Sequence, residues 1–424
     1  MSPKPRHAPC PPRPARRTLA ALALLAHAAC SASEDTPYRP ALPDAGPADA
    51  SAEPSLLDSG LDDSAVACQS DGAIVSVDPD EDWDHDGWAI AQGDCNDCDP
   101  STNPGAFDVA GSGSDEDCSG GVDDEPGACD GSLDPAANEA EDGARALGLC
   151  RFVEEFPSNP RARRWGVLSA RWRLADGTDG MHYASHGVLP DFGPHVHPQE
   201  GSALLALSTG TARRPGDLAF QPPAASDMET SCAAPEGWPK SSTACPSPLA
   251  PSSIANDSAS LELRVRAPTN ARSVSFRFSF YTAEFPAWVC NQYDDFFVAL
   301  LGRAQEPESN VSFDGAGNPI SVNGAFLEVC SPQVAGGKPY GCLLGNAELV
   351  GTGFEASDDE PRGHAATGWL ETTAPVIGGE TISLRLMVWD GGDHLRSSTV
   401  LIDGLRWDVT AASDAGTVRV PSPK

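Results

Sequence analysis

Strict alternation of apolar and polar side chains is the feature that most restricts how this chain can fold. Residues 261–266, 273–280 and 382–388 each place an apolar side chain at every second position. A repeat of two is that of a β-strand with one buried face. The apolar positions are Leu261, Leu263, Val265, Val274, Phe276, Phe278, Phe280, Ile382, Leu384, Leu386 and Val388. Many short strands joined by turn-rich segments predict a mainly β fold, an antiparallel β-sandwich or jelly roll over residues 151–412, with a disordered tail over residues 413–424.

Two details of this domain are predicted from local sequence. Asp403-Gly404, which joins the strand segments Leu401-Ile402 and Leu405-Arg406-Trp407, is a hairpin signal. The Pro- and Ser-rich segment 222–251 is expected to be a long surface excursion. A disulfide between Cys232 and Cys245 would shorten that excursion.

The first 30 residues have the order of a secretory signal peptide. A basic segment precedes the apolar run Leu19–Ala26, and no acidic or basic charge follows before Glu34. This run is too short to span a bilayer. We therefore expect an exported protein, either secreted or held at the outer membrane or cell surface by a lipid anchor, which would be its only contact with a membrane.

The sequence leaves two forms of the mature chain open. Residues 27–30 (His-Ala-Ala-Cys) resemble a bacterial lipobox, with His27 where Leu is usual, and predict lipidation of Cys30. The chain ends without a hydrophobic tail, which favours this anchor. Cleavage after Ala28 also fits the small-x-small rule. It would leave Cys30 as a thiol and, with Cys10 removed, an even number of the thirteen cysteines.

The charge of the chain restricts its possible partners. The sequence has 61 acidic and 28 basic residues, for a net charge of −33. A phosphate backbone would be repelled, so nucleic acid is not an expected partner.

Residues 31–67 consist mostly of Pro, Ala, Asp, Ser and Gly, which cannot bury enough apolar surface to offset the entropy of ordering. We predict a disordered stalk there.

A short amphipathic helix is predicted within the segment 129–150. The residues on its apolar face are Ala136, Ala140, Ala144 and Leu147. Cys129 and Cys150 bracket the helix. They are predicted to form a disulfide, because cysteines of an exported protein are mostly paired.

Residues 68–128 are rich in Asp, Gly and Cys and poor in apolar residues, so they are expected to fold around disulfides and ions. Within them Asp82, Asp84 and Asp86 alternate before a glycine, which allows a curled loop to supply oxygens to calcium from one side. Asp94 comes one residue after the position at which an EF-hand loop carries its Glu. The alternative is a solvated acidic surface without a metal.

This acidic segment resembles the metal-binding motif named after the copper-binding surface protein MopE. The matching blocks are Asp82-Trp-Asp-His-Asp-Gly87, Asp94-Cys95, Pro104-Gly-Ala106 and Asp115-Glu-Asp-Cys118. His85 and residues 109–112 depart from the pattern. The resemblance implies a disulfide between Cys95 and Cys118, and leaves Cys98 as an additional cysteine that could pair with Cys68.

The predicted metal ligands of the acidic segment are Asp82, Asp84, Asp86, Trp88 through its carbonyl, Asp94, Asp97, Asp99, Asp115, Asp117 and Asp123. Calcium is the expected ion, because dense carboxylates suit it and copper prefers imidazole or sulfur. Copper is the alternative. It would depend on a group of four histidines, His182, His186, His195 and His197.

The sandwich carries a second resemblance. Two blocks, 279–298 and 388–403, are similar to the choice-of-anchor L domain family, on Ser279-Phe-Tyr-Thr-Ala-Glu284, Asp294-Asp295-Phe-Phe-Val298, Val388-Trp-Asp390-Gly-Gly-Asp393 and Ser398-Thr-Val-Leu-Ile-Asp403. The resemblance implies a secreted β-rich domain that differing anchors hold at cell surfaces, with no established catalytic activity.

Acidic residues within these blocks are candidates for a second calcium site or are turn residues; they are Glu284, Asp294, Asp295, Asp390 and Asp393. The sequence has no Gly-x-Ser-x-Gly elbow, His-Glu-x-x-His helix or phosphate loop, so no catalytic residue is predicted. The expected function is non-enzymatic binding or adhesion to an extracellular ligand such as a polysaccharide. The alternatives are a copper-binding surface protein and a carbohydrate hydrolase that uses Glu284 and Asp294.

Overall fold

The computed structural model describes residues 66–67, 75–76, 78–124, 127–135, 138–245, 252–304, 306–358 and 360–420. They all lie in one compact unit, Ser64–Lys424. The predictions for the signal peptide, for Cys30 and for residues 31–65 of the stalk fall outside the described residues. At the end of the predicted stalk, β1 (Val66–Ala67) pairs with β2 (Val75–Ser76), so the stalk prediction is wrong for these two residues.

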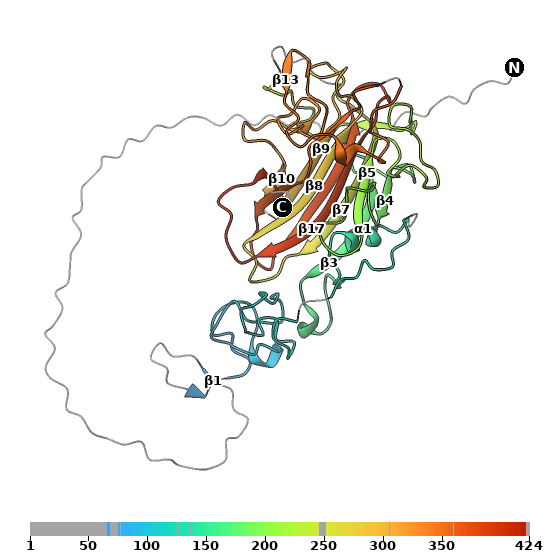
Figure 1. Cartoon of the computed structure of the whole chain (residues 1–424). Helices are drawn as coiled ribbons and strands as arrows, with labels where there is room; N and C mark the ends of the chain where they lie inside the picture. The colour runs from blue at the N-terminus through green and yellow to red at the C-terminus, as the bar shows by residue number, and fades with distance from the viewer. Residues whose placement is uncertain are drawn as a thin grey trace, which may run out of the picture. The chain divides into compact units, whose positions relative to one another are not determined.

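Two antiparallel sheets of seven strands each form the β domain, which confirms the predicted mainly β antiparallel fold (Figure 1). The first sheet has the order β10 (Glu306–Asn310), β9 (Phe296–Arg303), β16 (Thr381–Asp390), β7 (Ile254–Arg266), β3 (Gly166–Arg173), with β11 (Ile320–Ser321) on β9 and β6 (Ser231–Ala233) on β7. The second has the order β18 (Gly416–Arg419), β15 (Leu370–Pro375), β8 (Ser273–Thr282), β17 (Ser398–Asp408), β5 (Leu204–Ser208), β4 (His186–Leu189), with β14 (Ala365–Ala366) on β8.

Smaller elements complete the described chain. They are the hairpin of β12 (Gln333–Ala335) and β13 (Lys338–Tyr340), the helix α1 (Ala140–Ala146), and the 3-10 turns η1 (Ile90–Gln92), η2 (Pro160–Ala162) and η3 (Ala347–Leu349).

The alternating residues build the core between the two sheets, as the sequence predicts. All eleven are buried in one hydrophobic cluster. Leu263 of β7 lies opposite Leu384 of β16, and Phe278 of β8 lies opposite Ile402 of β17. The Phe278 ring contacts the ring of Phe297, on β9 of the first sheet, at 4.6 Å between centroids. Side chains of both sheets therefore interdigitate in a single core.

Long connections cover apolar residues on the outer face of the first sheet. Phe296 and Trp389 point away from the central core and are fully buried. Trp238, from the predicted surface excursion, packs edge-on against Trp389 at 5.5 Å and against Phe296 at 5.7 Å. The described part of this excursion is therefore a packed cover, because the sheet carries apolar residues on both faces here.

Two of the three predicted disulfides are present, and the third is wrong. Cys95–Cys118 and Cys129–Cys150 are bonded. Cys98 is also disulfide-bonded, and its expected partner Cys68 lies outside the described residues.

Cys232 and Cys245 do not pair with each other. Cys245 pairs with Cys290, and Cys330 pairs with Cys342. Cys232 is a buried thiol, because pairing of β6 with β7 turns its side chain into the cluster around Trp389. The disulfide thus fixes the excursion to a distant loop instead of closing it on itself.

The predicted hairpin at Asp403-Gly404 is also wrong. β17 runs through both residues with an irregular register between Asp403 and Arg406, and Gly404 has a φ of 59°. This is a local bulge, in which a glycine takes the left-handed conformation without reversing the strand. The buried Asp403 carboxylate accepts a hydrogen bond from the Glu200 N–H at 3.1 Å, which fixes the bulge from the neighbouring loop.

The predicted disordered tail contains a strand. Residues 416–419 form β18, which pairs with β15. Thr417 is buried, and its hydroxyl lies 2.8 Å from that of Thr372. A short polar segment is ordered here because a sheet edge offers it backbone and hydroxyl partners, which composition alone does not reveal.

The helix α1 lies on the core, as the spacing of its apolar residues by three and four positions predicts. Ala140, Ala144 and Leu147 are buried in the main cluster, whereas Ala136 falls outside the described residues. Gly143, which weakens the helix, has a packing reason. A Cβ there would lie 2.7 Å from the ring of Trp172 on β3, so only glycine allows the helix to approach the sheet this closely.

Candidate metal sites

The first candidate site is the acidic loop, residues 82–97. Asp82, Asp84 and Asp86 each offer a carboxylate oxygen within 4.8 Å of one another, and Asp84 does the same with Asp94 and Asp97. Asp84 therefore belongs to both groups. The structure brings together five of the predicted ligands in one loop.

Each carboxylate in this loop uses one oxygen to hold the backbone. Oδ2 of Asp82 accepts the Gly87 N–H at 2.9 Å, Oδ1 of Asp84 accepts the Asp86 N–H at 3.2 Å, and Oδ1 of Asp94 accepts the Asn96 N–H at 2.8 Å. The second oxygens, Oδ1 of Asp82 and Oδ2 of Asp84 and Asp94, are buried without a hydrogen-bond partner among the described residues. Such oxygens are costly unless a cation binds them.

The charges of the loop oppose one another. Burial, and after it the charges of neighbouring carboxylates, raises the pKa of Asp86 to about 7 and that of Asp94 to about 6. The pKa of Asp84 is also raised, first by burial and then by Asp82 and Asp97. A divalent cation would reverse this repulsion.

Backbone conformation explains one departure from the motif. His85 has a φ of 64°, in the left-handed region, and Gly87 has a φ of 95°. A glycine would adopt the turn at position 85 without strain, whereas histidine carries a small cost there. The loop keeps its curl despite the substitution.

The other predicted ligands do not belong to the two clustered carboxylate groups of this loop. Asp99 accepts the N–H of Ser101 and the hydroxyl of Thr102, and Asp123 accepts the Gly111 N–H. Trp88 is buried within the loop, and its N–H donates to Asp86. No contact in the described structure assigns its carbonyl to the site.

Asp115 and Asp117 form a second group with Asp108, which the sequence did not single out. These carboxylates are engaged by backbone N–H groups. Asp108 accepts those of Glu116, Asp117 and Asp124, and Asp115 accepts those of Ser119 and Gly120. Asp117 also accepts a hydrogen bond from Arg151 at 3.2 Å. The second group therefore fits a cation less well than the first.

A chain of hydrogen bonds joins the acidic loop to the sandwich. The Asn103 amide donates to Oδ2 of Asp86 at 2.7 Å, and its own oxygen accepts the Thr269 hydroxyl at 2.7 Å. Thr269 lies in the turn between β7 and β8, and its N–H donates to the Gly105 carbonyl at 3.0 Å. The order of the loop is thereby coupled to its attachment on the β domain.

The second candidate site is a group of four buried carboxylates in the sandwich, which we call the buried quartet: Glu284, Asp294, Asp295 and Asp390. Their exposed fractions are 2%, 1%, 0% and 3%. Asp295 donates its N–H to Oε2 of Glu284 at 3.0 Å. The fifth predicted residue, Asp393, is exposed, and its N–H donates to Asp390 at 3.2 Å.

Two glycines bring the ends of this group together. A Cβ on Gly391 would lie 2.4 Å from the Asp294 carbonyl, and one on Gly392 would lie 2.3 Å from the ring of Tyr293. Only glycines therefore allow the turn after β16 to pass this close to residues 293–294. Asp390 is thus placed beside the carboxylates that precede β9.

The quartet is electrostatically strained. Burial and then the charges of Asp295 and Asp294 raise the pKa of Glu284 well above its usual range, and burial and Asp390 do the same for Asp295. Burial raises the pKa of Asp294 to about 7 and that of Asp390 to about 6. Lys338 is the basic side chain whose charge lowers the pKa of Asp294. Four such carboxylates must take up protons or hold a cation.

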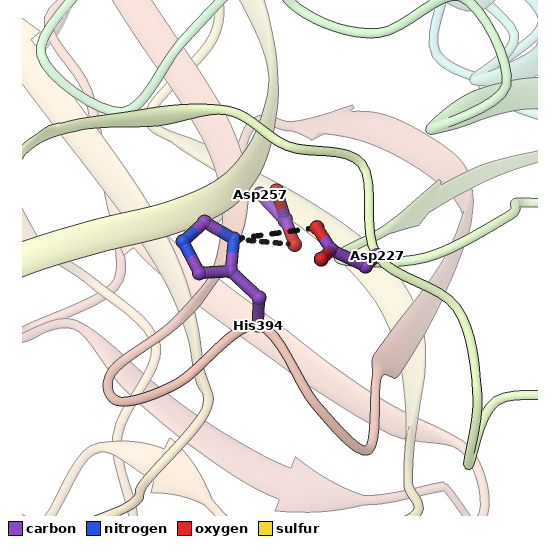
Figure 2. A group of neighbouring side chains, drawn as sticks. All are labelled: Asp227, Asp257 and His394. Atoms are coloured by element: carbon purple, nitrogen blue, oxygen red, sulfur yellow. Dashed lines mark hydrogen bonds and ion pairs between the residues drawn. The ribbon is translucent and has the colours of Figure 1, made fainter. Parts of the chain in front are cut away.

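A third group, absent from the sequence predictions, consists of Asp227, Asp257 and His394 (Figure 2). Nδ1 of His394 lies 2.9 Å from Oδ2 of Asp257 and 3.6 Å from Oδ1 of Asp227. The three residues are separated by up to 167 positions in the sequence, so no local pattern could reveal the group. The nearest signal is Asp390-Gly-Gly-Asp393, which ends one residue before His394.

The four histidines of the copper alternative do not form a site. His186 is buried on β4 and stacks on Trp172 at 4.2 Å, whereas His195 and His197 are exposed in a loop. In the described part of the chain, neither they nor His182 belong to any group of three or more clustered metal-ligating side chains. His195 and His197 lie outside every described strand.

The β domain of this chain matches a known protein family. No curated protein matches this chain. Within the residues that the structure describes, no helix is both long and apolar enough to cross a membrane. The family model of the choice-of-anchor L domain matches residues 202–406, a range that contains the buried quartet and the group around His394. The chain therefore carries a choice-of-anchor L domain, as expected of an exported or cell-surface protein.

Proposed function

We propose that this chain is a calcium-stabilised, non-enzymatic binding protein of the cell surface. The observation that carries the proposal is the acidic loop, where Asp84 belongs to two clusters of carboxylates and three buried carboxylate oxygens have no hydrogen-bond partner among the described residues. Calcium binds six to eight oxygens in flexible geometry, and carboxylates are its preferred protein ligands. Asp82, Asp84 and Asp94 would hold the ion, with Asp86 and Asp97 beside them.

Calcium would order the loop and its attachment together. The loop has few apolar side chains to form a core, and one of them, Trp83, is 41% exposed. Asp86 is the residue through which Asn103 and Thr269 connect the loop to the β domain. An ion that neutralises the loop would therefore also fix the acidic segment on the domain that binds the extracellular ligand.

Calorimetry of the exported chain tests the proposal after calcium has been removed with a chelator. The parent chain is expected to bind calcium at about 0.1 to 1 mM, as extracellular modules do. Asp84→Asn should weaken binding at least tenfold, because Asp84 belongs to both groups of the loop. Asp80→Asn is the matched control, since Asp80 is exposed and makes the same change in charge. Equal binding by the two variants would contradict the proposal, and stronger uptake of copper would favour the copper alternative.

The buried quartet is the candidate for a second calcium ion. Its carboxylates come from two parts of the chain that only the fold brings together, and their mutual repulsion gives a cation a reason to bind. The same burial argues against a hydrolase that uses Glu284 and Asp294, because side chains 2% and 1% exposed are not accessible to a polysaccharide. We therefore favour binding over catalysis.

Lipidation of Cys30 would hold the protein at the membrane. The proposal rests on the apolar run Leu19–Ala26 followed by His-Ala-Ala-Cys. Cys30→Ser is expected to move the protein from the membrane fraction to the soluble fraction of the cell envelope or the medium. Fractionation with an antibody to the β domain measures this, with Cys232→Ser as the control thiol. A variant that stays with the membrane would exclude Cys30 as the anchor.

A further inference from the structure

Three ligand atoms converge near the surface of the β domain, on elements that the calcium proposal does not use. Asp257 lies on β7, Asp227 precedes β6, and His394 lies in the turn after β16 (Figure 2). Nδ1 of His394 and one oxygen of each aspartate all lie within 4.8 Å of one another. Asp257 is 1% exposed at its side chain, His394 is 28% exposed and Asp227 is 47% exposed. The group is therefore anchored at one end and open to solvent at the other.

Hydrogen bonds on the far side of the imidazole determine which nitrogen carries a proton. The Ser231 hydroxyl donates to Oδ1 of Asn256 at 2.7 Å. The same Ser231 oxygen lies 3.3 Å from Nε2 of His394. Because the serine proton is directed to Asn256, the hydrogen in this second contact comes from Nε2 of the histidine.

With Nε2 protonated, Nδ1 faces the two carboxylates in one of two states. A neutral ring has a lone pair there, directed at Asp257 and Asp227, and a cation between the three atoms would bind that lone pair and both carboxylates. A charged ring has a proton there and forms an ion pair. Metal-binding histidines characteristically donate their other N–H to an oxygen that fixes the ring, as Nε2 does toward Ser231.

We propose that His394, Asp257 and Asp227 form a site for a divalent transition-metal ion of the zinc type. One imidazole and two carboxylates, with the remaining position open to water, are a donor set that zinc accepts. Calcium prefers oxygen ligands alone and is served by the acidic loop. The site therefore takes an ion of different chemistry from that of the calcium proposal and does not depend on it.

Backbone geometry holds the ligands in place. Asp257 has a φ of 46° and His394 a φ of 68°. The pairing of β16 with β7 shifts register between Val388 and Asp390, next to Asn256. A bulge of this kind redirects the side chain that follows it, and here it turns Asp257 toward His394.

Zinc titration of the exported chain tests the site, with calcium in excess so that carboxylate-only sites are occupied. The parent is expected to bind zinc in a component that His394→Ala and Asp227→Asn each weaken at least tenfold. Asp227 is exposed, so its variant is expected to fold. Ser231→Ala should weaken the same component roughly tenfold, which is the usual effect of removing a residue that orients a ligand.

His195→Ala is the matched control, because His195 is an exposed loop histidine outside the group. It should leave the component unchanged. The calcium variant Asp84→Asn should also retain it, which separates this inference from the proposed function. If the parent takes up no zinc, or if His394→Ala binds it as well as the parent, then the group is a histidinium ion pair and the inference is overturned.

Discussion

Calcium in excess is expected to raise the free energy of unfolding of the acidic segment by about 2.7 kcal/mol when its concentration is about 100 times the dissociation constant. The cause is preferential binding to the folded loop, whose carboxylate oxygens are collected only when Asp82, Asp84 and Asp94 lie together. Limited proteolysis between residues 78 and 124 measures the effect, because a protease cleaves the opened segment. Calcium should slow cleavage by about two orders of magnitude under these conditions.

The control for this prediction uses the two aspartate variants of the loop. Asp84→Asn should abolish most of the protection, whereas the exposed Asp80→Asn should retain it. Magnesium should protect less, since it demands a smaller, near-octahedral site and releases water reluctantly. Cleavage of the parent at the same rate with calcium and with chelator would show that disulfides alone order the segment.

Without a bound metal, the β domain is expected to lose stability as the pH rises from about 4.5 to about 7. Burial raises the pKa of Asp294 to about 7 and that of Asp390 to about 6 in the folded chain, from an ordinary value of 3.8. In this window the unfolded chain has lost these protons and the folded chain still holds them. Higher pH therefore favours the unfolded chain, by about 1.4 kcal/mol for each unit of difference in pKa.

Urea unfolding of the chelated protein across this window measures the slope. Asp294→Asn should reduce the slope, because the amide resembles the protonated acid and does not ionise. Ion pairs such as Arg264 with Glu155 act in the opposite direction, since the lowered pKa of Glu155 makes its contribution disappear in acid. This loss of stabilisation occurs at pH values below the window, where the Glu155 carboxylate takes up its proton. Stability that rises with pH from about 4.5 to about 7 would contradict the prediction.

The errors of sequence interpretation share one cause. Cys232 and Cys245 lie 13 residues apart in the sequence, yet pairing of β6 with β7 buries Cys232 as a free thiol and Cys245 bonds to Cys290 in a distant loop. Asp403-Gly404 has the composition of a hairpin turn but forms a bulge within β17. Residues 416–419 have the composition of a tail but pair with β15. In each case tertiary contacts outweigh a weak local preference.

The candidate metal sites also differ in how far local sequence could predict them. Asp82, Asp84 and Asp86 are close in sequence, so alternation before a glycine was enough to predict the loop, and the structure brings them together. Asp108 joins Asp115 and Asp117 without a comparable signal. The group around His394 has none at all, because its members come from three separate elements.

The mainly β class, the buried faces of the core strands and the position of the acidic loop could all be predicted from the sequence. Period-two alternation and closely spaced carboxylates are local properties, and burial of one strand face or curling of one loop follows from them directly. The sequence could not predict the disulfide at Cys245, the convergence of Glu284 and Asp294 with Asp390, or the clustering of Asp227 and Asp257 with His394. These depend on which strands pair and how closely two turns approach, and such long-range contacts are fixed by the packing of the whole domain.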